Sequence, residues 1–333
     1  MKKQMKFLIC GFGNCGQRHF RNLKTLLLDC EIDIVCSTKT NYRIFDNELN
    51  ISYTNNLKEI YDINEIYHDL DEALLNKYDA SFVCSLPPKR INMSIVLAEQ
   101  GINLFIEKPL SNNLDQVYKL QEIVEEKGLI CTFGFQMRFH PVFQKLKNMI
   151  DNKEFGEIYR IESLHSNNIH NWTKGRELSN FYALKSEKGG GALLSQIHEI
   201  DYLTYLFGKH YPISAIYGNW LNTEVEDNIT ILSNLESEDR CIPIIINLDF
   251  LSPIPRRDLT IYGMNKTESF NLLPHSSEEW NNLFLDEMKA FLNLLDVEKD
   301  SRLATLEDGI SSLEYCMDIK DNFMKVNYEN KSS

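Results

Sequence analysis

The sequence lacks the features of several large classes of protein. Its 333 residues carry a net charge of −13 and contain no block of basic residues. Nucleic-acid binding is therefore not expected, because contacts to a phosphate backbone need clustered Lys and Arg. No segment approaches the roughly 18 consecutive apolar residues of a membrane-spanning helix. The opening MKKQMKFLICGFG has an apolar run that glycines soon interrupt, so we expect neither a signal peptide nor a membrane partner.

Paired cysteines are also missing. The eight cysteines are dispersed and form no CxxC pair, the spacing typical of zinc sites and redox motifs. We expect reduced, mostly buried thiols in a cytoplasmic protein, with no disulfide and no bound metal. The sequence contains no internal repeat and no low-complexity segment, and its length suits two globular domains.

In the first third of the chain, short apolar runs alternate with amphipathic segments. This alternation predicts a parallel, doubly wound sheet, because strands buried on both faces are apolar throughout. The expected strands are 6–12, 32–37, 80–86, 103–109 and 129–135. The expected helices are 18–29, 70–77, 91–101 and 114–128.

After residue 136 the pattern changes to longer, alternating strands, which predict a mainly antiparallel open sheet. The expected strands are 158–166, 214–220, 228–235, 242–251 and 259–264. The expected helices are 143–152, a single helix over 192–208, 284–295 and 305–322. The sequence therefore predicts an α/β protein with one domain over 1–136 and a second over 137–333.

A glycine-rich turn follows the first predicted strand and precedes a helix. In this context GxGxxG is a dinucleotide-binding fingerprint. Gly11 allows the tight turn, Gly13 lets the backbone approach a pyrophosphate, and Gly16 lets the helix pack on the strand. The helix N-terminus offers N–H groups to the phosphates. The remaining residues of the turn expected at the cofactor are Phe12, Asn14 and Cys15.

The end of the second strand should determine which nicotinamide cofactor binds. An acid about 20 residues beyond the glycines would favour NAD by binding the ribose 2′-hydroxyl, but 36–43 contains none. Hydroxyl and basic groups there suit a 2′-phosphate, so NADP is favoured over NAD; the alternative is an ordinary polar loop that accepts either. The cofactor residues expected here and after the next strand are Ser37, Thr38, Lys39, Arg43, Ser85 and Pro87.

Glu107, Lys108 and Pro109 end another predicted strand. The carboxyl ends of strands line the ligand crevice in open α/β sheets. Lys108 would direct its ammonium toward the nicotinamide and a substrate hydroxyl, with Glu107 and Pro109 beside the cofactor. The alternative is a surface lysine beside a turn.

Three glycines at 189–191 precede the segment ALLSQIHEIDYLTYLFG. On one expected helix, Leu194, His198, Asp201 and Tyr205 share a face. His198 is suited to accept a proton near neutral pH, and Asp201 could orient it; the alternative is a structural histidine. The segment is not a zinc-protease HExxH motif, because Tyr202 occupies the second histidine position.

A further group combines aromatic and guanidinium side chains, which suit sugar faces and phosphates. The alternative is that these side chains pack where the two domains join. The candidate substrate contacts are Arg138, Trp172, Arg176 and Tyr182, together with Asp201.

Taken together, these motifs resemble the Gfo/Idh/MocA family of NAD(P)-dependent oxidoreductases. The resemblance rests on GFGNCGQRH at 11–19, EKP at 107–109, GFQMRFHP at 134–141 and GGGALLSQIHEIDYLTYLFG at 189–208. It also includes VEDN at 225–228, SPIPRRDLTIYG at 252–263 and DEMKAFLNLL at 286–295. It implies a Rossmann dinucleotide-binding domain over 1–136 and a substrate-binding and oligomerisation α/β domain with a large open sheet over 137–333. It also implies assembly through that sheet into homodimers or homotetramers.

The resemblance also implies hydride transfer at a sugar carbon. Lys108 would position the hydroxyl, and His198 would be the general acid/base. The HEIDYLxxLFG version with the PxPRR strand resembles a branch associated with nucleotide sugars and bacterial surface polysaccharides. The alternative substrates are a free sugar, an inositol or a non-sugar.

The sequence departs from the family pattern in two places. Many members carry an Asp one turn before the histidine, where this chain has Leu194 and Ser195. Either Asp201 replaces that carboxylate or Lys108 performs most of the proton transfer; a cofactor-binding sensor or scaffold without turnover is the remaining alternative. The second departure is PPKR at 87–90, whose basic residues would either favour a phosphate or be exposed.

Overall fold

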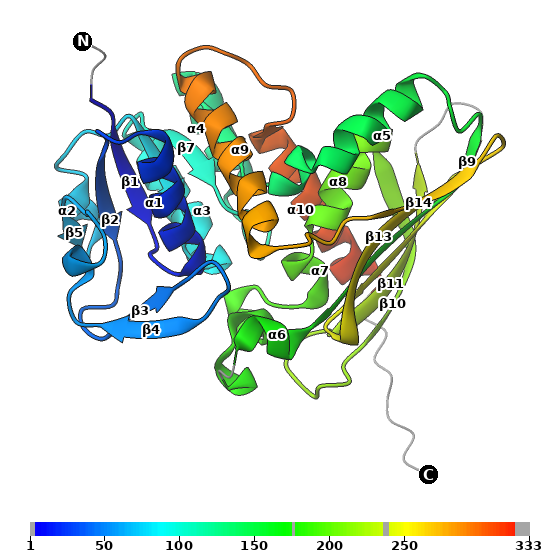
Figure 1. The fold of residues 1–333 in the computed structure, drawn as a ribbon, viewed down its shortest axis with the longest axis horizontal. Coiled ribbons are helices and arrows are strands. Elements are labelled where there is room, and N and C mark those ends of the chain that lie inside the picture. Colours follow the sequence, from blue (N-terminus) through cyan, green and yellow to red (C-terminus); the bar gives the residue numbers. More distant parts are fainter. Residues whose placement is uncertain (1–3, 175–176, 236–239, 324–333) are drawn as a thin grey trace. The chain divides into compact units, whose positions relative to one another are not determined.

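The structure is a computed structural model that describes residues 4–174, 177–235 and 240–323. The chain forms two compact units (Figure 1). The first comprises the chain up to Phe139 together with Pro274–Ile310, and the second comprises His140–Leu273 together with the chain from Ser311.

The first unit is built on a sheet with the strand order β15-β8-β7-β6-β1-β2-β5. Its strands are β1 (Lys6–Cys10), β2 (Glu31–Val35), β5 (Ile66–Tyr67), β6 (Ala80–Val83), β7 (Asn103–Ile106), β8 (Cys131–Phe133) and β15 (Ala304–Thr305). All pairs are parallel except β15 with β8. Residues of β1 and β6 are almost completely buried, as expected for strands covered on both faces.

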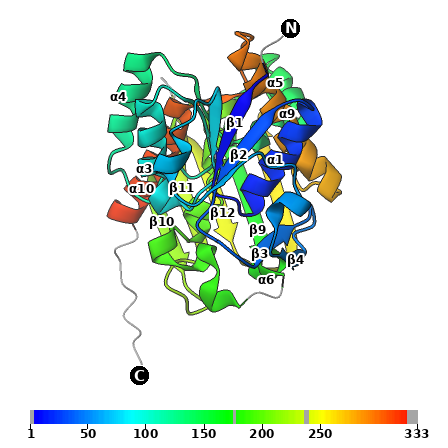
Figure 2. The same cartoon turned by 90° about the vertical axis from the view of Figure 1, so that its left-hand side faces the viewer.

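Helices cover both faces of this sheet. α3 (Pro87–Glu99) and α4 (Val117–Lys127) lie on one face, and α1 (Asn14–Leu26) and α9 (Ser277–Leu295) lie on the other (Figure 2). The expected helix at 70–77 is only one turn, α2 (Leu70–Ala73). The predicted doubly wound parallel sheet is thereby confirmed.

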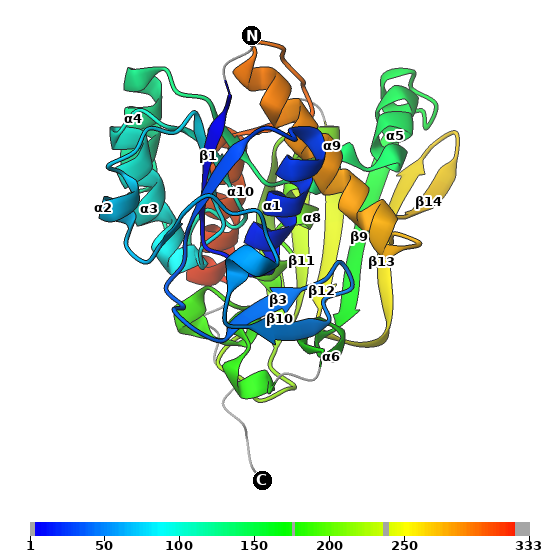
Figure 3. The same cartoon turned by 60° about the vertical axis from the view of Figure 1, so that its left-hand side comes forward.

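The first unit includes a segment that the sequence analysis placed in the second domain. Helix α9 runs beside α1 (Figure 3), and Asn281 donates a hydrogen bond to Asn22 at 3.1 Å. The ring of Phe291 packs at 5.5 Å from that of Phe82 and at 5.4 Å from that of Phe105. The expectation that 137–333 forms one continuous domain is therefore wrong for 274–310, because the apolar face of α9 completes the core of the first unit.

A separate hairpin follows β2, in a stretch where the sequence patterns predicted no strand. It consists of β3 (Tyr42–Phe45) and β4 (Ile51–Thr54), paired antiparallel. The buried side chain of Gln17 on α1 holds it: the amide donates to the Arg43 carbonyl at 2.7 Å and accepts from the Phe45 N–H at 2.8 Å. The glycine turn and the hairpin are thus connected through one side chain.

The second unit contains a sheet with the strand order β10-β11-β12-β9-β13-β14. Its strands are β9 (Ile158–Asn168), β10 (His210–Gly218), β11 (Asn228–Leu235), β12 (Ile242–Asp249), β13 (Leu251–Gly263) and β14 (Thr267–Asn271). All pairs are antiparallel except β12 with β9. The predicted mainly antiparallel sheet is confirmed.

Helices pack against one face of this second sheet. Tyr202 of α8 (His198–Phe207) hydrogen bonds to Ser163 of β9 at 2.7 Å. Tyr315 of α10 (Leu306–Asn322) hydrogen bonds to Ser233 of β11. Buried residues alternate with more exposed ones along β11 and β12, which is why these strands are recognisable in the sequence. The other helices of this unit include α5 (Pro141–Asp151) and α6 (Ile169–Thr173).

The single helix expected over 192–208 is two helices. α7 (Ala192–Ser195) ends where Gln196 leaves the helical conformation, and α8 begins at His198. The Gln196 amide donates to the Asp249 carbonyl at the end of β12 at 3.1 Å. Leu194 therefore does not lie on the same helix face as His198, which corrects that expectation.

Within the described residues, no helix is long and apolar enough to cross a membrane.

Candidate active site

The glycine turn has the geometry that a bound pyrophosphate needs. Gly11 has φ +98°, and a Cβ there would lie 2.7 Å from the Ser85 N. A Cβ at Gly16 would lie 2.1 Å from the Gly11 carbonyl oxygen, whereas a Cβ at Gly13 would meet nothing within 4 Å. The N-cap of α1 is Gly13, which has no side chain that could cover the helix N–H groups, and the first turn of α1 carries no acid. Close packing at Gly11 and Gly16, together with open space at Gly13, fits a dinucleotide bound at the N-terminus of α1.

Side chains around the turn agree with this assignment. The hydroxyl of Ser85 is buried and has no hydrogen-bond partner among the described residues, so a polar group of a ligand could supply one. Pro87 occupies the first turn of α3 and is buried. Burial and the nearby Glu107 raise the pKa of the Cys15 thiol to about 11, so this thiol is protonated at neutral pH.

The residues predicted to select the cofactor lie after β2 and on the hairpin. Ser37, Thr38 and Lys39 are exposed, and so is Arg43 on β3. Hydrogen bonding by Gln17 fixes the Arg43 backbone. Their role in binding a 2′-phosphate stays a prediction.

Lys108 lies in a loop whose conformation is held by buried charged residues. Its peptide bond to Pro109 is cis. Glu107 accepts a hydrogen bond from the Lys108 N–H at 3.2 Å, and its other oxygen contacts the His19 Nε2 at 2.7 Å. Burial by itself would raise the pKa of Glu107, but the His19 hydrogen bond and the nearby cations bring it below its usual value. Glu107 is therefore a buried carboxylate that connects α1 to the Lys108 backbone.

Arg90 provides a second connection to this loop. Its guanidinium is buried and donates to the Pro109 carbonyl and, at 2.6 Å, to the Ser85 carbonyl. The segments that follow β6 and β7 are thus joined by one side chain. Of the two alternatives for the basic pair at 89–90, exposure holds for Lys89 but not for Arg90, two of whose guanidinium nitrogens donate to backbone carbonyls. Phosphate binding by this pair stays a prediction.

Arg138, a candidate substrate contact, forms an ion pair within the first unit. Its guanidinium nitrogens lie 3.2 and 3.1 Å from the two carboxylate oxygens of Asp308, and its side chain is 4% exposed. This arrangement holds the end of the β8 segment against the start of α10. A substrate contact for Arg138 stays a prediction.

In the second unit, His198 is the first residue of α8 and Asp201 lies one turn later; both are buried. Trp172 of α6 packs edge-on against Phe250 at 5.4 Å. Tyr182 is 38% exposed and packs on Phe181. Arg176 lies outside the described residues. The catalytic and substrate-binding roles of these residues stay predictions.

Glu199, the residue after His198, belongs to a group of three buried polar residues that the sequence patterns do not reveal. Glu199 accepts a hydrogen bond from the Arg257 Nε at 2.7 Å, and the same oxygen contacts the His165 Nδ1 at 3.2 Å. The sequence marked Arg257 only through its motif and Glu199 only as the neighbour of His198. Their pairing depends on three distant segments, so no local pattern reveals it.

Glu226, in the VEDN motif, supports the segment before His198. Its carboxylate accepts from the Leu193 N–H at 3.1 Å, and its backbone carbonyl accepts from the Ala192 N–H at 3.0 Å. A Cβ at Gly191, which has φ +108°, would lie 2.3 Å from the Glu226 Oε1. Glycine is therefore required at position 191, because a side chain there would collide with Glu226 and because the backbone φ is positive.

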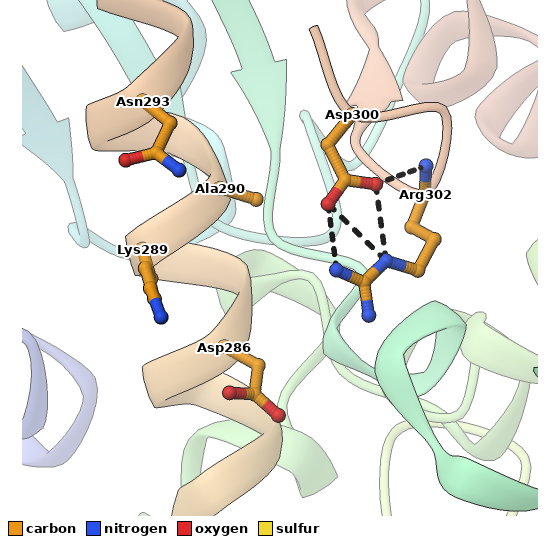
Figure 4. Close-up of a pocket in the computed structure, with 6 residues that line it drawn as sticks. All are labelled: Asp286, Lys289, Ala290, Asn293, Asp300 and Arg302. Carbon is orange, nitrogen blue, oxygen red and sulfur yellow. Dashed lines mark hydrogen bonds and ion pairs between the residues drawn. The ribbon is translucent and has the colours of Figure 1, made fainter. Parts of the chain in front are cut away.

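A small pocket elsewhere in the first unit is not part of this site. Figure 4 shows it beside α9, with the Asp300–Arg302 ion pair at its edge. The residues that line it are Asp286, Lys289, Ala290, Asn293, Asp300 and Arg302, none of which belongs to the predicted site. No group of metal-ligating side chains occurs in the part of the chain that the structure describes.

A doubly wound parallel sheet whose glycine turn leads into a helix N-terminus is the architecture of a dinucleotide-binding domain. Comparison with protein families identifies it further. Residues 5–135 match the model described as "Oxidoreductase family, NAD-binding Rossmann fold", and residues 143–267 match the "GFO/IDH/MocA C-terminal domain". The chain belongs to the Gfo/Idh/MocA family of oxidoreductases, and its first unit contains an NAD-binding Rossmann fold.

Curated relatives are similar over part of their length. The chain is 26% identical over 254 residues to the uncharacterized oxidoreductase YrbE of Bacillus subtilis, covering 74% of this chain and 68% of that protein. It is 27% identical over 224 residues to the scyllo-inositol 2-dehydrogenase (NAD(+)) of the same organism, covering 67% and 59%, respectively.

Solved structures are similar over nearly the whole chain. Scyllo-inositol dehydrogenase from Lactobacillus casei, with bound NAD(H) and scyllo-inositol, superposes with a TM-score of 0.80 at 20% identity and covers 97% of this chain and 98% of that one. The WlbA dehydrogenase from Bordetella pertussis, in complex with NADH and UDP-GlcNAcA, gives 0.76 at 17% identity and covers 96% of each. At these identities the likeness establishes the fold.

Proposed function

We propose that this protein is an NAD(P)-dependent dehydrogenase that oxidises a hydroxyl-bearing carbon of a sugar, with a nucleotide sugar as its leading substrate. The observation that carries the proposal is the Lys108 loop, which Glu107 and Arg90 hold at the carboxyl end of β7 in a unit with a nucleotide-binding turn. Strand ends of this kind line ligand crevices in open α/β sheets.

The proposed chemistry assigns separate tasks to Lys108 and His198. A bound nicotinamide would supply the acceptor for a hydride from the carbinol carbon. Loss of that hydride requires loss of the hydroxyl proton, which His198 accepts. The Lys108 ammonium donates a hydrogen bond to the hydroxyl oxygen and makes it more acidic. Proton transfer by a positioned side chain contributes about 100- to 10,000-fold to the rate. In the reverse direction the same two groups support reduction of a ketone.

An inositol is the second candidate substrate. It is favoured by similarity to the scyllo-inositol 2-dehydrogenase and to the inositol dehydrogenase structures, whereas WlbA, crystallised with UDP-GlcNAcA, supports a nucleotide sugar. We further propose NADP as the preferred cofactor, because 36–43 carries basic and hydroxyl side chains without an acid. A cytoplasmic location, a role in surface-glycan biosynthesis and assembly through the open sheet also remain proposals.

A single-turnover experiment tests the function. Stoichiometric enzyme is mixed with NADP⁺ or NAD⁺ and each of scyllo-inositol, myo-inositol, UDP-GlcNAcA and further nucleotide sugars, while the absorbance of reduced nicotinamide is followed. A rise with one compound identifies substrate and cofactor together. Bound cofactor that stays oxidised with every compound would favour the sensor or scaffold alternative.

A variant of His198 tests its proposed role as the general base. His198→Asn should slow the absorbance rise about 100- to 10,000-fold, while His275→Asn, an exposed histidine of the first unit, should leave it unchanged. Equal rates in the two variants would exclude His198 as the base.

A further inference from the structure

The start of α8 is attached to three neighbouring strands of the second sheet. Gln196, just before the helix, donates to the Asp249 carbonyl of β12, and Glu199, in its first turn, contacts residues of β9 and β13. The order β12-β9-β13 makes these strands adjacent. His198 lies between the two attached residues, so its backbone position is set from both sides.

Glu199 is the centre of this attachment. Its side chain is fully buried, and the partner side chains of Arg257 and His165 are 3% and 10% exposed. Burial by itself would raise the pKa of Glu199, but Arg257 and His165 lower it to about 2, so the carboxylate is charged at neutral pH. Arg256, the neighbouring arginine, instead has an exposed side chain paired with Asp258.

Stability alone accounts poorly for this buried cluster. Buried ion pairs are often neutral or unfavourable compared with well-packed apolar residues of similar volume. Within the described residues, the second oxygen of Glu199 and the Arg257 Nη2 are buried without a hydrogen-bond partner, which adds a desolvation penalty. A cluster with incomplete hydrogen bonding, one residue from the predicted general base, points to a functional constraint.

We propose that Glu199, held by Arg257 and His165, is a positioning residue that fixes the first turn of α8 and thereby the orientation of His198. This inference rests on the proposed function. It also accounts for the departure at Leu194 and Ser195: the chain lacks a carboxylate before His198 but holds a buried one immediately after it. Adjacent helical residues do not face each other, so Glu199 acts on His198 through the helix backbone.

The test compares Glu199→Gln with the double variant Glu199→Leu/Arg257→Met. The readouts are thermal melting, cofactor Kd, and kcat with its solvent deuterium isotope effect, using whichever compound of the single-turnover panel reduces the cofactor. Glu199→Gln should lower kcat about 10- to 100-fold, the order expected from small misplacement of a catalytic group. Its cofactor Kd should be unchanged, and its solvent isotope effect should rise as proton transfer becomes slower.

The double variant separates positioning from stability. It removes both buried charges, so its melting temperature should recover compared with Glu199→Gln, while kcat stays low. Recovery of kcat together with the melting temperature would overturn the inference and leave the cluster a purely structural role. Tyr202→Phe is the matched control: it removes the hydrogen bond from the same helix to Ser163 and should leave kcat and the isotope effect unchanged.

The outcomes also separate this inference from the proposed function. A wild-type enzyme that turns over, with a Glu199→Gln variant that matches its kcat per folded molecule, overturns only the positioning role. A wild-type enzyme that reduces cofactor with none of the panel compounds overturns the proposed function and the positioning role with it.

Discussion

The two candidate catalytic residues lie in different kinds of surroundings. Around Lys108, charged side chains act on the backbone: Arg90 donates to two carbonyls, and Glu107 accepts from an N–H. Around His198, charged side chains pair with each other between a helix and the sheet, as Glu199 of α8 does with Arg257 of β13. The first arrangement uses Glu107, which is adjacent to Lys108 in sequence, and Arg90 on α3, whereas the second joins three more distant segments. Disrupting the first should mainly impair catalysis, and disrupting the second should impair stability as well.

Removing the ammonium of Lys108 gives the largest expected effect. Lys108→Ala should lower turnover by about 1,000-fold or more, because it removes the charge that acidifies the substrate hydroxyl, and should change the cofactor Kd little. Single-turnover kinetics and cofactor titration measure the two quantities. Lys127→Ala, on the exposed end of α4, serves as the control. A Lys108→Ala enzyme with wild-type rates would show that the Lys108 loop has no catalytic role.

Breaking the charge cluster beside His198 should give the largest loss of stability. Arg257→Met leaves the Glu199 carboxylate buried and without its arginine, which costs about 3–5 kcal/mol. Arg256→Ala, an exposed neighbour on the same strand, should change stability by about 0.5 kcal/mol or less. Chemical denaturation of both variants measures the contrast. Equal losses would mean that burial of the cluster has no energetic consequence.

Low pH should destabilise the second unit by protonating Glu199 of the same cluster. The pKa of Glu199 is about 2 in the folded protein and about 4.3 in an unfolded chain. Its contribution is therefore fully present above about pH 4.3 and is lost as the pH falls toward 2, amounting to about 3 kcal/mol. The Glu199→Leu/Arg257→Met variant should show a weaker pH dependence of denaturation in this range. An unchanged dependence would assign acid sensitivity to other carboxylates.

The smallest expected effect concerns cofactor choice in the first unit. A double variant, Lys39→Ala/Arg43→Ala, removes two exposed cations near the predicted ribose site and should lower the preference for NADP over NAD about tenfold, equivalent to about 1.4 kcal/mol. The ratio of the two Kd values measures it. Lys58→Ala, on the exposed segment after the hairpin, is the control. A wild-type enzyme that prefers NAD would show that the loop does not recognise a 2′-phosphate.

Local sequence patterns predicted those elements whose structure depends mainly on neighbouring residues. The glycine turn, the alternating strands of the second sheet and the strand that ends at Glu107 are all recognisable from contiguous residues. The hairpin at 42–54 was missed because its strands are short and its position depends on the side chain of Gln17. The helix break at Gln196 was missed because its cause is a carbonyl in β12.

Contacts between distant segments could not be predicted from local sequence patterns either. Glu199, His165 and Arg257 lie on three separate elements, and only the register of β9 with β13, where His165 faces Arg257, brings the last two together. Helix α9 is a second example. Its apolar face could pack against either unit as far as the sequence pattern shows, and the contacts of Phe291 with Phe82 and Phe105 place it in the first.

The return of α9 to the first unit has a consequence for how the protein is made. Because the chain passes between units at 139/140, 273/274 and 310/311, the nucleotide-binding unit cannot be completed until the ribosome has synthesised Ile310. Until α9 has been synthesised, the rings of Phe82 and Phe105 lack the cover of Phe291. An amino-terminal fragment ending at Phe139 would therefore expose part of its core, and a gene cut between the two sheets would not yield two independent proteins.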